Sequence, residues 1–431
     1  MMTAWRGPEL CARVIGLAAS DHGGAFAWLD GGDERGWLGI DADLAVAADS
    51  LRSLPAIEAL WRAEPQFVWI GHITYDLGAD LLLGRAPRVG RLPGLSLRRY
   101  RAALELGTRS RLHGDAQAGA RLMRRLTEAP VLKDMSLGTW PLGQVAARWS
   151  ATEYRAKVDA VRAFIAAGET YQVNLSQAFA APWREAWRRR PLATRAAALY
   201  AALRGATPAT MGALLAGAEG KGPPLWVVSN SPETLVSVEL GAGVGGGDLA
   251  RSWPIKGTRA RGGDPPSDMA AAAELLASEK DLAEHVMIVD LVRSDLGRVA
   301  VPGTVEAPRR PTLVSLPTVH HLVSEVRCTL RPGWGLTDLL AAVFPGGSIT
   351  GAPKRRTVEI IDDLEQRRRG LYCGAIVALM PGGLRCSIPI RTGELDETGL
   401  TLQSGGGIVI DSDPEAERQE TWAKVRAFDR G

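Results

Sequence analysis

The sequence predicts an α+β protein with many strands, most of them antiparallel. Short apolar runs broken by Gly, Asp and Pro fill the first 110 residues, which is typical of strands joined by turns. Other segments carry apolar residues every three or four positions, which indicates helices. The 431 residues contain no repeat of 20–50 residues, so a solenoid or propeller is not expected.

Composition excludes several classes of protein. Hydrophobic residues make up 46% and charged residues 23%, as in ordinary soluble globular proteins. The 51 Lys and Arg nearly balance the 48 Asp and Glu, so composition gives no sign of a nucleic-acid partner. The four cysteines are widely spaced, which argues against a zinc site and favours a reducing compartment. With no clear signal peptide and no long apolar run, we expect a cytoplasmic protein without a membrane partner.

The elements follow from the local pattern. Thr152 opens a helix whose apolar residues recur at intervals of three and four, and Gly168 ends it. A Ser-Pro turn separates two further strands, and glycines between residues 241 and 247 mark a loose hairpin loop. The expected strands are residues 25–29, 67–71, 225–229, 234–239, 374–380, 385–391 and 399–404. The expected helices are residues 152–168, 270–299, 354–368 and 414–428.

Lys256 lies between a short apolar strand and a Gly turn, in residues 253–262. From this segment alone, a solvated turn lysine is favoured over a nucleophile. A lysine nucleophile must lose its proton from an ordinary pKa of about 10.4, which costs roughly 4–5 kcal/mol at pH 7 unless burial or nearby cations lower that pKa. Arg259 and Arg261 are candidates for such cations.

Glu284 lies in the predicted helix that includes residues 279–290. Leu282, Val286 and two further valines form an apolar stripe, and the neighbouring stripe that carries Glu284 is also largely apolar. A helix with so wide an apolar arc is mostly buried, so Glu284 is expected to point into the interior or a cleft. The alternative is a salt bridge to Lys280 at i−4, worth only a few tenths of a kcal/mol. Both interpretations stay open on this helix alone.

The last helix brings three charged residues to one face. Asp413 is a good N-cap and Pro414 suits the first helical position. Glu417, Glu420 and Lys424 then share a face, which in isolation is more often a solvent face. Two carboxylates brought together from separate helices would suit Mg²⁺, a hard cation that prefers oxygen ligands.

Two glycine-rich segments expose backbone. Residues 344–354 form a loop before a helix, where N–H groups can hold a carboxylate or phosphate, although the spacing is not that of a Walker A loop. Residues 404–409 offer a second surface of backbone alone. Weaker candidates are residues 171–176, residues 317–322 and Arg391, each of which is more often structural when taken alone.

In order and spacing, these segments resemble the chorismate-utilising enzymes, a family that includes anthranilate synthase component I, isochorismate synthase and aminodeoxychorismate synthase component I. The matches at 279–299, 344–364 and 404–424 are highly specific in combination. The resemblance implies large, mostly antiparallel sheets sandwiched together with helices outside. It also implies that residues 1–145 form an N-terminal part of this sandwich and that residues 146–431 form the chorismate-binding catalytic region.

Lys256, within Pro-Ile-Lys-Gly-Thr at 254–258, resembles the aminodeoxychorismate synthase branch, because the anthranilate and isochorismate branches usually have Ala there. By that resemblance, chorismate binds with Mg²⁺, the Lys256 amine attacks C2, and the C4 hydroxyl leaves. Ammonia then adds at C4 and expels Lys256, which gives 4-amino-4-deoxychorismate. No Gly-x-Cys-x-Gly element suggests a glutaminase nucleophile, so a separate glutamine amidotransferase subunit is the expected ammonia source.

The resemblance also assigns the remaining site positions. Glu233 matches the general acid, and His321 matches a histidine near the departing hydroxyl. Gln172 lies where isochorismate-type relatives place a lysine base, and the change to Gln argues against water activation. Glu284 and Glu420 match the Mg²⁺ ligands. The positions expected to hold the substrate are Thr258, Tyr372, Arg391, Gly405, Gly406, Gly407 and Lys424.

Two other functions compete with this prediction. Anthranilate synthase component I would release pyruvate itself. A nucleic-acid-binding protein is suggested by the arginine runs at 188–190 and 367–369. Both runs lie at expected helix ends, where cations interact favourably with the helix dipole and with water, so this second alternative is disfavoured.

Overall fold

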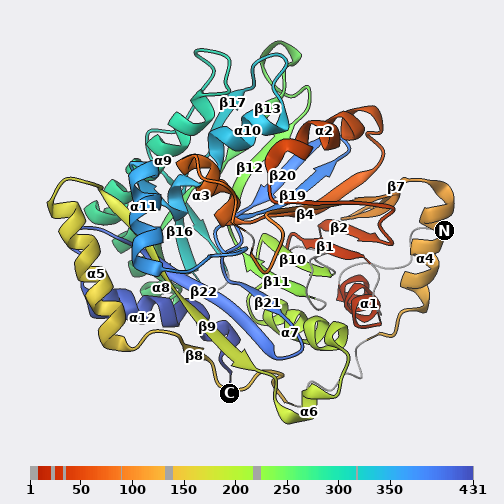
Figure 1. The fold of residues 1–431 in the computed structure, drawn as a ribbon, viewed down its shortest axis with the longest axis horizontal. Coiled ribbons are helices and arrows are strands. Elements are labelled where there is room, and N and C mark those ends of the chain that lie inside the picture. The colour runs from red at the N-terminus through yellow and green to blue at the C-terminus, as the bar shows by residue number, and fades with distance from the viewer. Residues whose placement is uncertain are drawn as a thin grey trace.

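The computed structural model describes residues 8–20, 25–32, 35–88, 90–131, 139–216, 225–316 and 319–430. In this part of the chain the strands form two large sheets and one small sheet, and neighbouring strands pair in the antiparallel sense (Figure 1). The helices lie around the sheets (Figure 1). The α+β class and the antiparallel pairing predicted from the sequence are confirmed.

The bounds of the elements are as follows. The 11-stranded sheet has the spatial order β18 (Gly351–Ala352), β9 (Gln172–Pro182), β22 (Gly399–Ile408), β21 (Thr392–Leu395), β11 (Trp226–Ser231), β10 (Met211–Ala216), β1 (Phe26–Asp30), β2 (Gly36–Ile40), β6 (Ala102–Leu106) and β7 (Arg111–Gly114), with β8 (Ala146–Ala147) beside β9. The 8-stranded sheet has the order β17 (Val326–Thr329), β13 (Leu249–Ser252), β12 (Thr234–Glu239), β20 (Gly383–Ser387), β19 (Ala375–Met380), β4 (Val68–Ile73), β5 (Leu95–Tyr100) and β3 (Leu44–Ala48). The small sheet consists of β14 (Ile255–Ala260), β16 (Val319–Val323) and β15 (Thr312–Ser315). The helices are α1 (Pro8–Ala19), α2 (Leu54–Ala63), α3 (Tyr75–Leu83), α4 (Ala116–Glu128), α5 (Ala151–Ala166), α6 (Glu185–Arg188), α7 (Leu192–Ala206), α8 (Pro265–Ala277), α9 (Glu279–Gly297), α10 (Leu336–Val343), α11 (Lys354–Glu365) and α12 (Pro414–Val425), with short 3₁₀ turns η1 (Leu51–Ser53), η3 (Val244–Gly246), η4 (Gly347–Ile349) and η5 (Arg426–Phe428).

The two large sheets pack face to face. Side chains alternate between the faces of a strand, so each strand contributes to two layers. In β1, Phe26 and Trp28 face outer helices, whereas Ala27 packs between the sheets. In β4, Val68 and Ile70 pack against the same layer as Ala27. This shared apolar layer makes the two sheets a sandwich, as predicted.

Helices cover the outer faces of the sandwich. The helices α1, α4 and α7 share a core with the 11-stranded sheet, and α2 and α10 share one with the 8-stranded sheet. A further cluster joins α5 and α11 to the ends of β9 and β22. In Figure 1 the helices α5, α8, α9, α11 and α12 gather on one side of the molecule. In the part of the chain that the structure describes, none of the helices combines the length and apolar character needed to cross a membrane.

The strand predictions hold with changes at some ends. The strands expected near residues 25, 67, 225, 234 and 374 are confirmed as β1, β4, β11, β12 and β19. The strand expected to reach Arg391 ends at Ser387, and Arg391 itself has a positive φ of 50°, outside the extended region. The strand expected to end at Ser404 continues as β22 through the glycines to Ile408, because these glycines keep pairing with β9.

The long helix expected at residues 270–299 is wrong as a single element. It is two helices, α8 and α9, and Ser278 separates them with extended backbone. The Ser278 hydroxyl accepts a hydrogen bond from the Asp281 N–H, so it caps the second helix. The helix that begins at Lys354 ends at Glu365 rather than at 368, because Gln366 is left-handed with φ 49°.

The chain crosses between the large sheets at the turn after β11. Although β11 and β12 are consecutive, β11 belongs to the 11-stranded sheet and β12 to the 8-stranded sheet. Their short connection, residues 232–233, therefore lies where the two sheets meet. Both sheets contain strands from each side of residue 145, and a boundary at that residue stays a prediction.

Candidate active site

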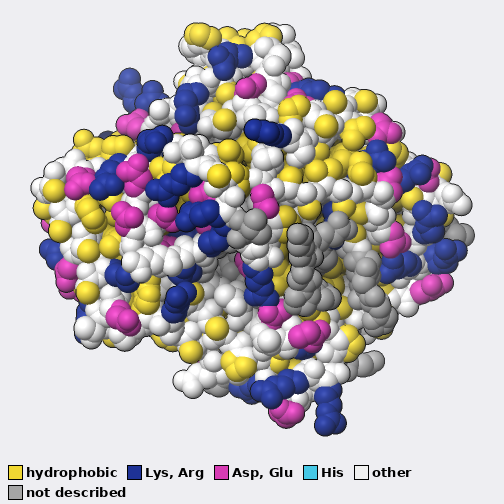
Figure 2. Space-filling view, in the orientation of Figure 1, with side chains coloured by type: hydrophobic (Ala, Val, Ile, Leu, Met, Phe, Trp, Pro, Cys, Tyr) yellow, Lys and Arg dark blue, Asp and Glu magenta, His cyan; other side chains and the backbone are white. Residues whose placement is uncertain are grey.

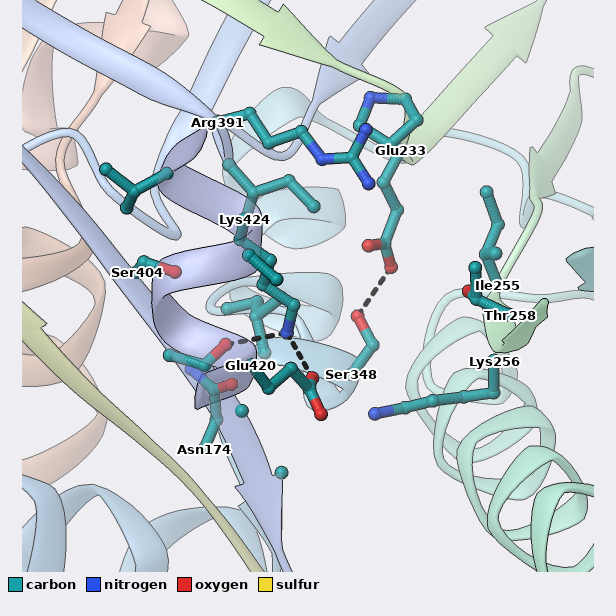
Figure 3. Close-up of a pocket in the computed structure, with 18 of the residues that line it drawn as sticks. Asn174, Glu233, Ile255, Lys256, Thr258, Ser348, Arg391, Ser404, Glu420 and Lys424 are labelled. Atoms are coloured by element: carbon teal, nitrogen blue, oxygen red, sulfur yellow. Dashed lines mark hydrogen bonds and ion pairs between the residues drawn. The ribbon is translucent and has the colours of Figure 1, made fainter. Parts of the chain in front are cut away.

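A cavity of about 1050 Å³ opens between two parts of the fold. One side consists of β22 and α12, and the other consists of β14 and the junction between α8 and α9 (Figure 3). All the predicted site residues except Gln172 line it. These residues are Glu233, Lys256, Thr258, Glu284, His321, Tyr372, Arg391, Gly405, Gly406, Gly407, Glu420 and Lys424.

Lys256 extends from β14 into the cavity, toward Glu420 (Figure 3). A bulge in the strand aims it there, because Lys256 pairs with Leu322 whereas Thr258 pairs with the adjacent His321. Gly257 forms the bulge with φ 74°, and a side chain at this position would also meet Leu322 and the α8–α9 junction. The Gly turn seen in the sequence is therefore the device that directs Lys256 away from a regular ladder position.

Thr258 and His321 lie on facing strands of the small sheet. A hydrogen bond of 2.9 Å joins Thr258 Oγ1 to His321 Nδ1. His321 is buried, and burial lowers its pKa, with the charge of Arg391 acting in the same direction and a hydrogen bond to Gly257 opposing them. The imidazole is therefore neutral at neutral pH and can donate or accept one further hydrogen bond in the cavity.

Glu233 occupies the turn where the chain crosses between the sheets. It is buried, and its Oε1 accepts a hydrogen bond of 2.8 Å from the Ser348 hydroxyl (Figure 3). Burial raises the pKa of this carboxyl, and the Ser348 hydrogen bond and the charges of Lys256, Lys424 and Arg391 only partly oppose the rise. A carboxyl with a raised pKa at a cavity wall can act as a proton donor.

Two cations, Arg391 and Lys424, lie close enough for their charges to act on Glu233. Arg391 is half-buried, and burial lowers its pKa although the charge of Glu233 acts to raise it. Lys424 forms an ion pair of 2.6 Å with Glu420 and donates a 2.8 Å hydrogen bond to the carbonyl of Gly405 (Figure 3). Arg391 and Lys424 therefore give the cavity positive charge that suits an anionic ligand.

Glu284 and Glu420 bring carboxylates to the cavity from α9 and α12. Burial raises the pKa of Glu284, and the charge of Glu420 adds to the rise. Burial also acts to raise the pKa of Glu420, but Lys424, Lys256 and Lys280 outweigh it and lower that pKa. Mutual repulsion of two carboxylates beside one cavity is the arrangement that a hard cation relieves, so the donor set fits Mg²⁺.

The fit to Mg²⁺ has a limit. Among the described residues, no group of three or more His, Cys, Asp and Glu side chains is arranged to hold a metal ion. A cation held by Glu284 and Glu420 would therefore complete its coordination with water or with oxygens of a bound ligand, as Mg²⁺ commonly does.

Gly405, Gly406 and Gly407 bring bare backbone to the cavity wall. A Cβ at Gly405 would lie 2.3 Å from a backbone oxygen of β9, and one at Gly406 would lie 2.8 Å from Glu417 Oε2. Real Cβ contacts are longer, so only glycine fits Gly405 without a shift of the paired strand. Because these residues have no side chains, the backbone of this segment itself forms part of the cavity wall, where a ligand can approach it closely.

Gln172 does not line the cavity. Its side chain is fully buried behind the glycine segment, where a Cβ at Gly407 would lie 2.8 Å from Gln172 Nε2. Both polar atoms of this amide are buried without a hydrogen-bond partner. Its catalytic role stays a prediction, and in this structure it supports Gly407 from behind.

Several residues of the cavity were given no site role from the sequence, although Glu417 was placed on one helix face with Glu420 and the segment beginning at Ser404 was singled out. Asn174 and Ser404 are buried beside the glycine segment, Ser348 holds Glu233, and Lys280 and Glu417 add charge near the carboxylates. Asn174 carried a signal, because it follows Gln172 by two positions in a strand and so shares its face. Ser348 gave no comparable signal within its glycine-rich loop.

The burial expected for the Glu284 helix is partly wrong. Val286, assigned to the apolar stripe, is 51% exposed, because α9 packs with only part of that arc. Glu284 nevertheless lines the cavity, as expected from its interior or cleft placement.

The two arginine runs differ in the structure. Residues 188–190 are exposed, but Arg369 is buried and Arg367 and Arg368 are half-buried, so the second run is not solvated. On the face shown in Figure 2, Lys and Arg lie interspersed with Asp and Glu. The second run therefore does not provide the solvated basic patch on which the nucleic-acid alternative depended.

Comparison with known proteins agrees with this geometry. The family model described as chorismate binding enzyme matches residues 24–430. The chain is 38% identical over 366 residues to aminodeoxychorismate synthase component 1 of Salmonella typhimurium, covering 83% of this chain and 74% of that protein. It is 35% identical over 408 residues to anthranilate synthase component 1 of Streptomyces coelicolor, covering 91% and 71%. Anthranilate synthase component I from Streptococcus pneumoniae has a similar structure, with a TM-score of 0.68, 27% identity and coverage of 84% and 80%.

The sandwich and its cavity are thus those of an enzyme that acts on a small anionic ligand. The chain belongs to the chorismate binding enzyme family.

Proposed function

We propose that this protein is component 1 of an aminodeoxychorismate synthase, which converts chorismate and ammonia into 4-amino-4-deoxychorismate and water. The similarity to relatives with that name supports the proposal. The observation that carries it is the position of Lys256, whose amine extends into the cavity between Glu233 and the carboxylates of Glu284 and Glu420.

Chorismate is a dianion, so its binding depends on local cations and backbone donors. Arg391 and Lys424 provide the positive charge, and the backbone of residues 405–407 provides a close wall. Tyr372 is buried and forms part of the cavity wall. These groups hold the ring in one orientation above Lys256, which makes attack by its amine effectively intramolecular.

The amine of Lys256 attacks in its neutral form. Its nitrogen forms a bond to C2 of the ring, the two conjugated ring double bonds each shift by one position toward C4, and the C4–O bond breaks. The departing hydroxyl takes the proton of Glu233 and leaves as water, because hydroxide is a poor leaving group. The neutral His321 also lines the cavity and can hydrogen-bond to the departing hydroxyl.

Ammonia completes the exchange. Its nitrogen bonds to C4, both ring double bonds shift back, and the Lys256–C2 bond breaks with its electron pair returning to Lys256. The proton lost by the new ammonium restores the acid form of Glu233. The sum is chorismate plus ammonia giving 4-amino-4-deoxychorismate plus water, so the lysine and the acid are both regenerated.

Glu284 and Glu420 are the residues that would hold Mg²⁺. The ion would neutralise a carboxylate of the substrate and lower the cost of bringing a dianion beside these two side chains. Ammonia is proposed to come from a glutamine amidotransferase subunit, since the name component 1 of the relatives implies a second component.

The test is the identity of the product. Purified protein is incubated with chorismate, Mg²⁺ and ammonium, and the product is identified by mass spectrometry. The proposal expects replacement of one hydroxyl by an amino group, with the enolpyruvyl group retained. Prompt formation of fluorescent anthranilate, with no lyase added, would instead assign the protein to the anthranilate synthases.

A variant pair tests the nucleophile. Lys256→Ala is expected to lose most of the activity with ammonium while keeping the fold, because the side chain is only half-buried. Lys157→Ala is the control, since that lysine lies outside the cavity and donates to the carbonyl of Leu364. Wild-type rates in Lys256→Ala would remove the covalent step from the mechanism.

A further inference from the structure

The buried ion pair of Arg369 and Glu365 lies directly behind the cavity. Arg369 is 1% exposed and Glu365 is 3% exposed. Arg369 donates through Nε and Nη2 to the two carboxylate oxygens at 3.0 and 2.7 Å. Burial acts to raise the pKa of Glu365, but the charges of Arg369 and Arg367 outweigh it and lower that pKa. Both members of the pair are therefore charged at neutral pH.

The guanidinium also joins two segments that line the cavity. Its Nη2 donates to the carbonyl of Asn174 in β9 at 2.5 Å, and its Nη1 donates to the carbonyl of Ile349 in η4 at 3.3 Å. Asn174 and Ile349 both face the cavity. One rigid, planar group thus fixes the distance between a strand and a loop that are far apart in sequence.

Other contacts extend this arrangement. The Arg369 guanidinium lies 5.7 Å from the ring centre of Tyr372, and the Arg369 carbonyl accepts a 2.7 Å hydrogen bond from Gln403 Nε2. Tyr372 and Gln403 also line the cavity. Glu365 Oε1 accepts hydrogen bonds of 2.8 Å from both the N–H and the hydroxyl of Ser176, which pairs with Gly405 across the strands.

Arg369 does not face the cavity itself. Its partners nevertheless belong to two of the parts that the proposed reaction must align. Through β9 it supports the glycine segment, and through Ile349 it supports the neighbouring Ser348, which holds Glu233. A small shift of the guanidinium would therefore change the position of the acid relative to the substrate-binding backbone.

Stability alone does not account for such a pair. A buried ion pair gains little net free energy, because desolvation of both charges offsets their attraction, and well-packed apolar residues often replace it without loss. What apolar residues cannot do is hold two carbonyl oxygens and a carboxylate at fixed positions around one planar group.

We infer that Arg369 is a positioning residue, which aligns the acid-bearing loop with the glycine segment for the reaction proposed above, on which this inference rests. It acts through Asn174, Ile349 and Glu365 and touches no substrate. Loss of the alignment lowers kcat more than it raises KM, because the groups that bind the substrate remain in place.

Two variants separate alignment from folding. Arg369→Lys keeps the positive charge beside Glu365 but loses the two guanidinium nitrogens that donate to the carbonyls of Asn174 and Ile349. The double variant Glu365→Gln/Arg369→Met removes both charges, so neither is left buried and unpaired, and the new amide side chain still offers an oxygen to Ser176. Arg195→Met is the matched control, because Arg195 is also 1% exposed but contacts Glu397 and Trp183, which lie outside the cavity.

The assay measures kcat and KM for chorismate, with ammonium and Mg²⁺ in excess, together with the melting temperature of each variant. A misplacement of about 1 Å can cost 100-fold, so Arg369→Lys and the double variant are expected to lose about 10- to 100-fold in kcat with little change in KM. Arg195→Met is expected to keep the wild-type kcat.

Either Arg369→Lys or the folded double variant with a wild-type kcat would overturn the inference. A lower melting temperature with unchanged kcat and KM would likewise show a structural role only. If the wild-type protein itself forms no aminated product, the proposed function fails instead. The inference, which rests on that function, is then overturned with it.

Discussion

The substitution Glu233→Gln tests whether Glu233 donates a proton, because it changes little else in the site. Glutamine has nearly the same volume as glutamic acid and can still accept a hydrogen bond from Ser348, but it cannot give up a proton. General acid catalysis contributes about 10²–10⁴-fold, or about 2.7–5.4 kcal/mol of barrier, so the variant is expected to lose activity by that factor.

The same substitution is expected to stabilise the fold at alkaline pH. Burial raises the pKa of Glu233 in the folded state, so folding favours its protonated form. That contribution to stability is fully present below the unfolded pKa and is lost as pH rises through the folded pKa. The glutamine side chain has no charged form, so the variant avoids the loss, and the two proteins are expected to unfold at similar urea concentrations only in acid.

The assay records initial rates and urea midpoints across the pH range. In the wild type, kcat is expected to fall as pH rises above the raised pKa of Glu233. This fall is expected to be absent from the pH–rate profile of Glu233→Gln. Ser348→Ala removes the hydrogen bond that lowers this pKa, so kcat of that variant is expected to fall at a higher pH than in the wild type. Glu239→Gln, on an exposed carboxyl that pairs with Arg251, is the control. If Glu233→Gln has a near wild-type kcat that falls at the same alkaline pH, the role of Glu233 as proton donor is refuted.

Other predictions follow from single contacts. Gly405→Ala is expected to lower the melting temperature, because its Cβ would lie 2.3 Å from a backbone oxygen, whereas Gly406→Ala is expected to fold, since its Cβ would meet flexible carboxylates; thermal melts of the pair check this contrast. Glu284→Gln is expected to raise the Mg²⁺ concentration for half-maximal rate by about tenfold or more, and an unchanged Mg²⁺ titration would contradict its role as a ligand. Lys354→Met removes one of two cationic partners of buried Asp295, the other being Arg298, and is expected to cost about 1.5–3 kcal/mol of unfolding free energy in urea, part of which Asp295→Asn in the same chain should restore.

Local signals accounted for much of the fold. The strands β1 and β4 were predictable as short apolar runs bounded by turn residues, and the helix α5 from its apolar residues at intervals of three and four, with Gly168 just after its end. The ends that moved depend on backbone conformation rather than on periodicity. Gln366 adopts a left-handed conformation and ends α11 early, although glutamine is a good helix former.

The residues of the site were harder to predict from the sequence than the helices and strands. Lys256 and residues 405–407 were found through the order and spacing of the family's segments, because the Lys256 segment alone favoured a solvated lysine. Ser348 and Lys280 reach the cavity only through long-range packing, which no local pattern reports. Gln172 shows the opposite case, since a matching motif position lies behind the cavity wall rather than on it. Motif position fixes which strand carries a residue, and packing decides what that residue touches.

The arginine run at 367–369 shows how packing can reverse an expectation from charge. Cations after a helix are usually solvated, and α11 does end just before this run. Here the left-handed residue at 366 turns the chain inward, so that Arg369 meets Glu365 one turn back and Asn174 from a strand nearly two hundred residues earlier in the chain. The buried acid on α11 makes this turn favourable, because it provides the charge that Arg369 needs once water is removed. What distinguishes Arg369 from a solvated arginine is therefore the buried carboxylate of Glu365, four positions before it at the end of the helix. In this fold that ion pair lies directly behind the cavity.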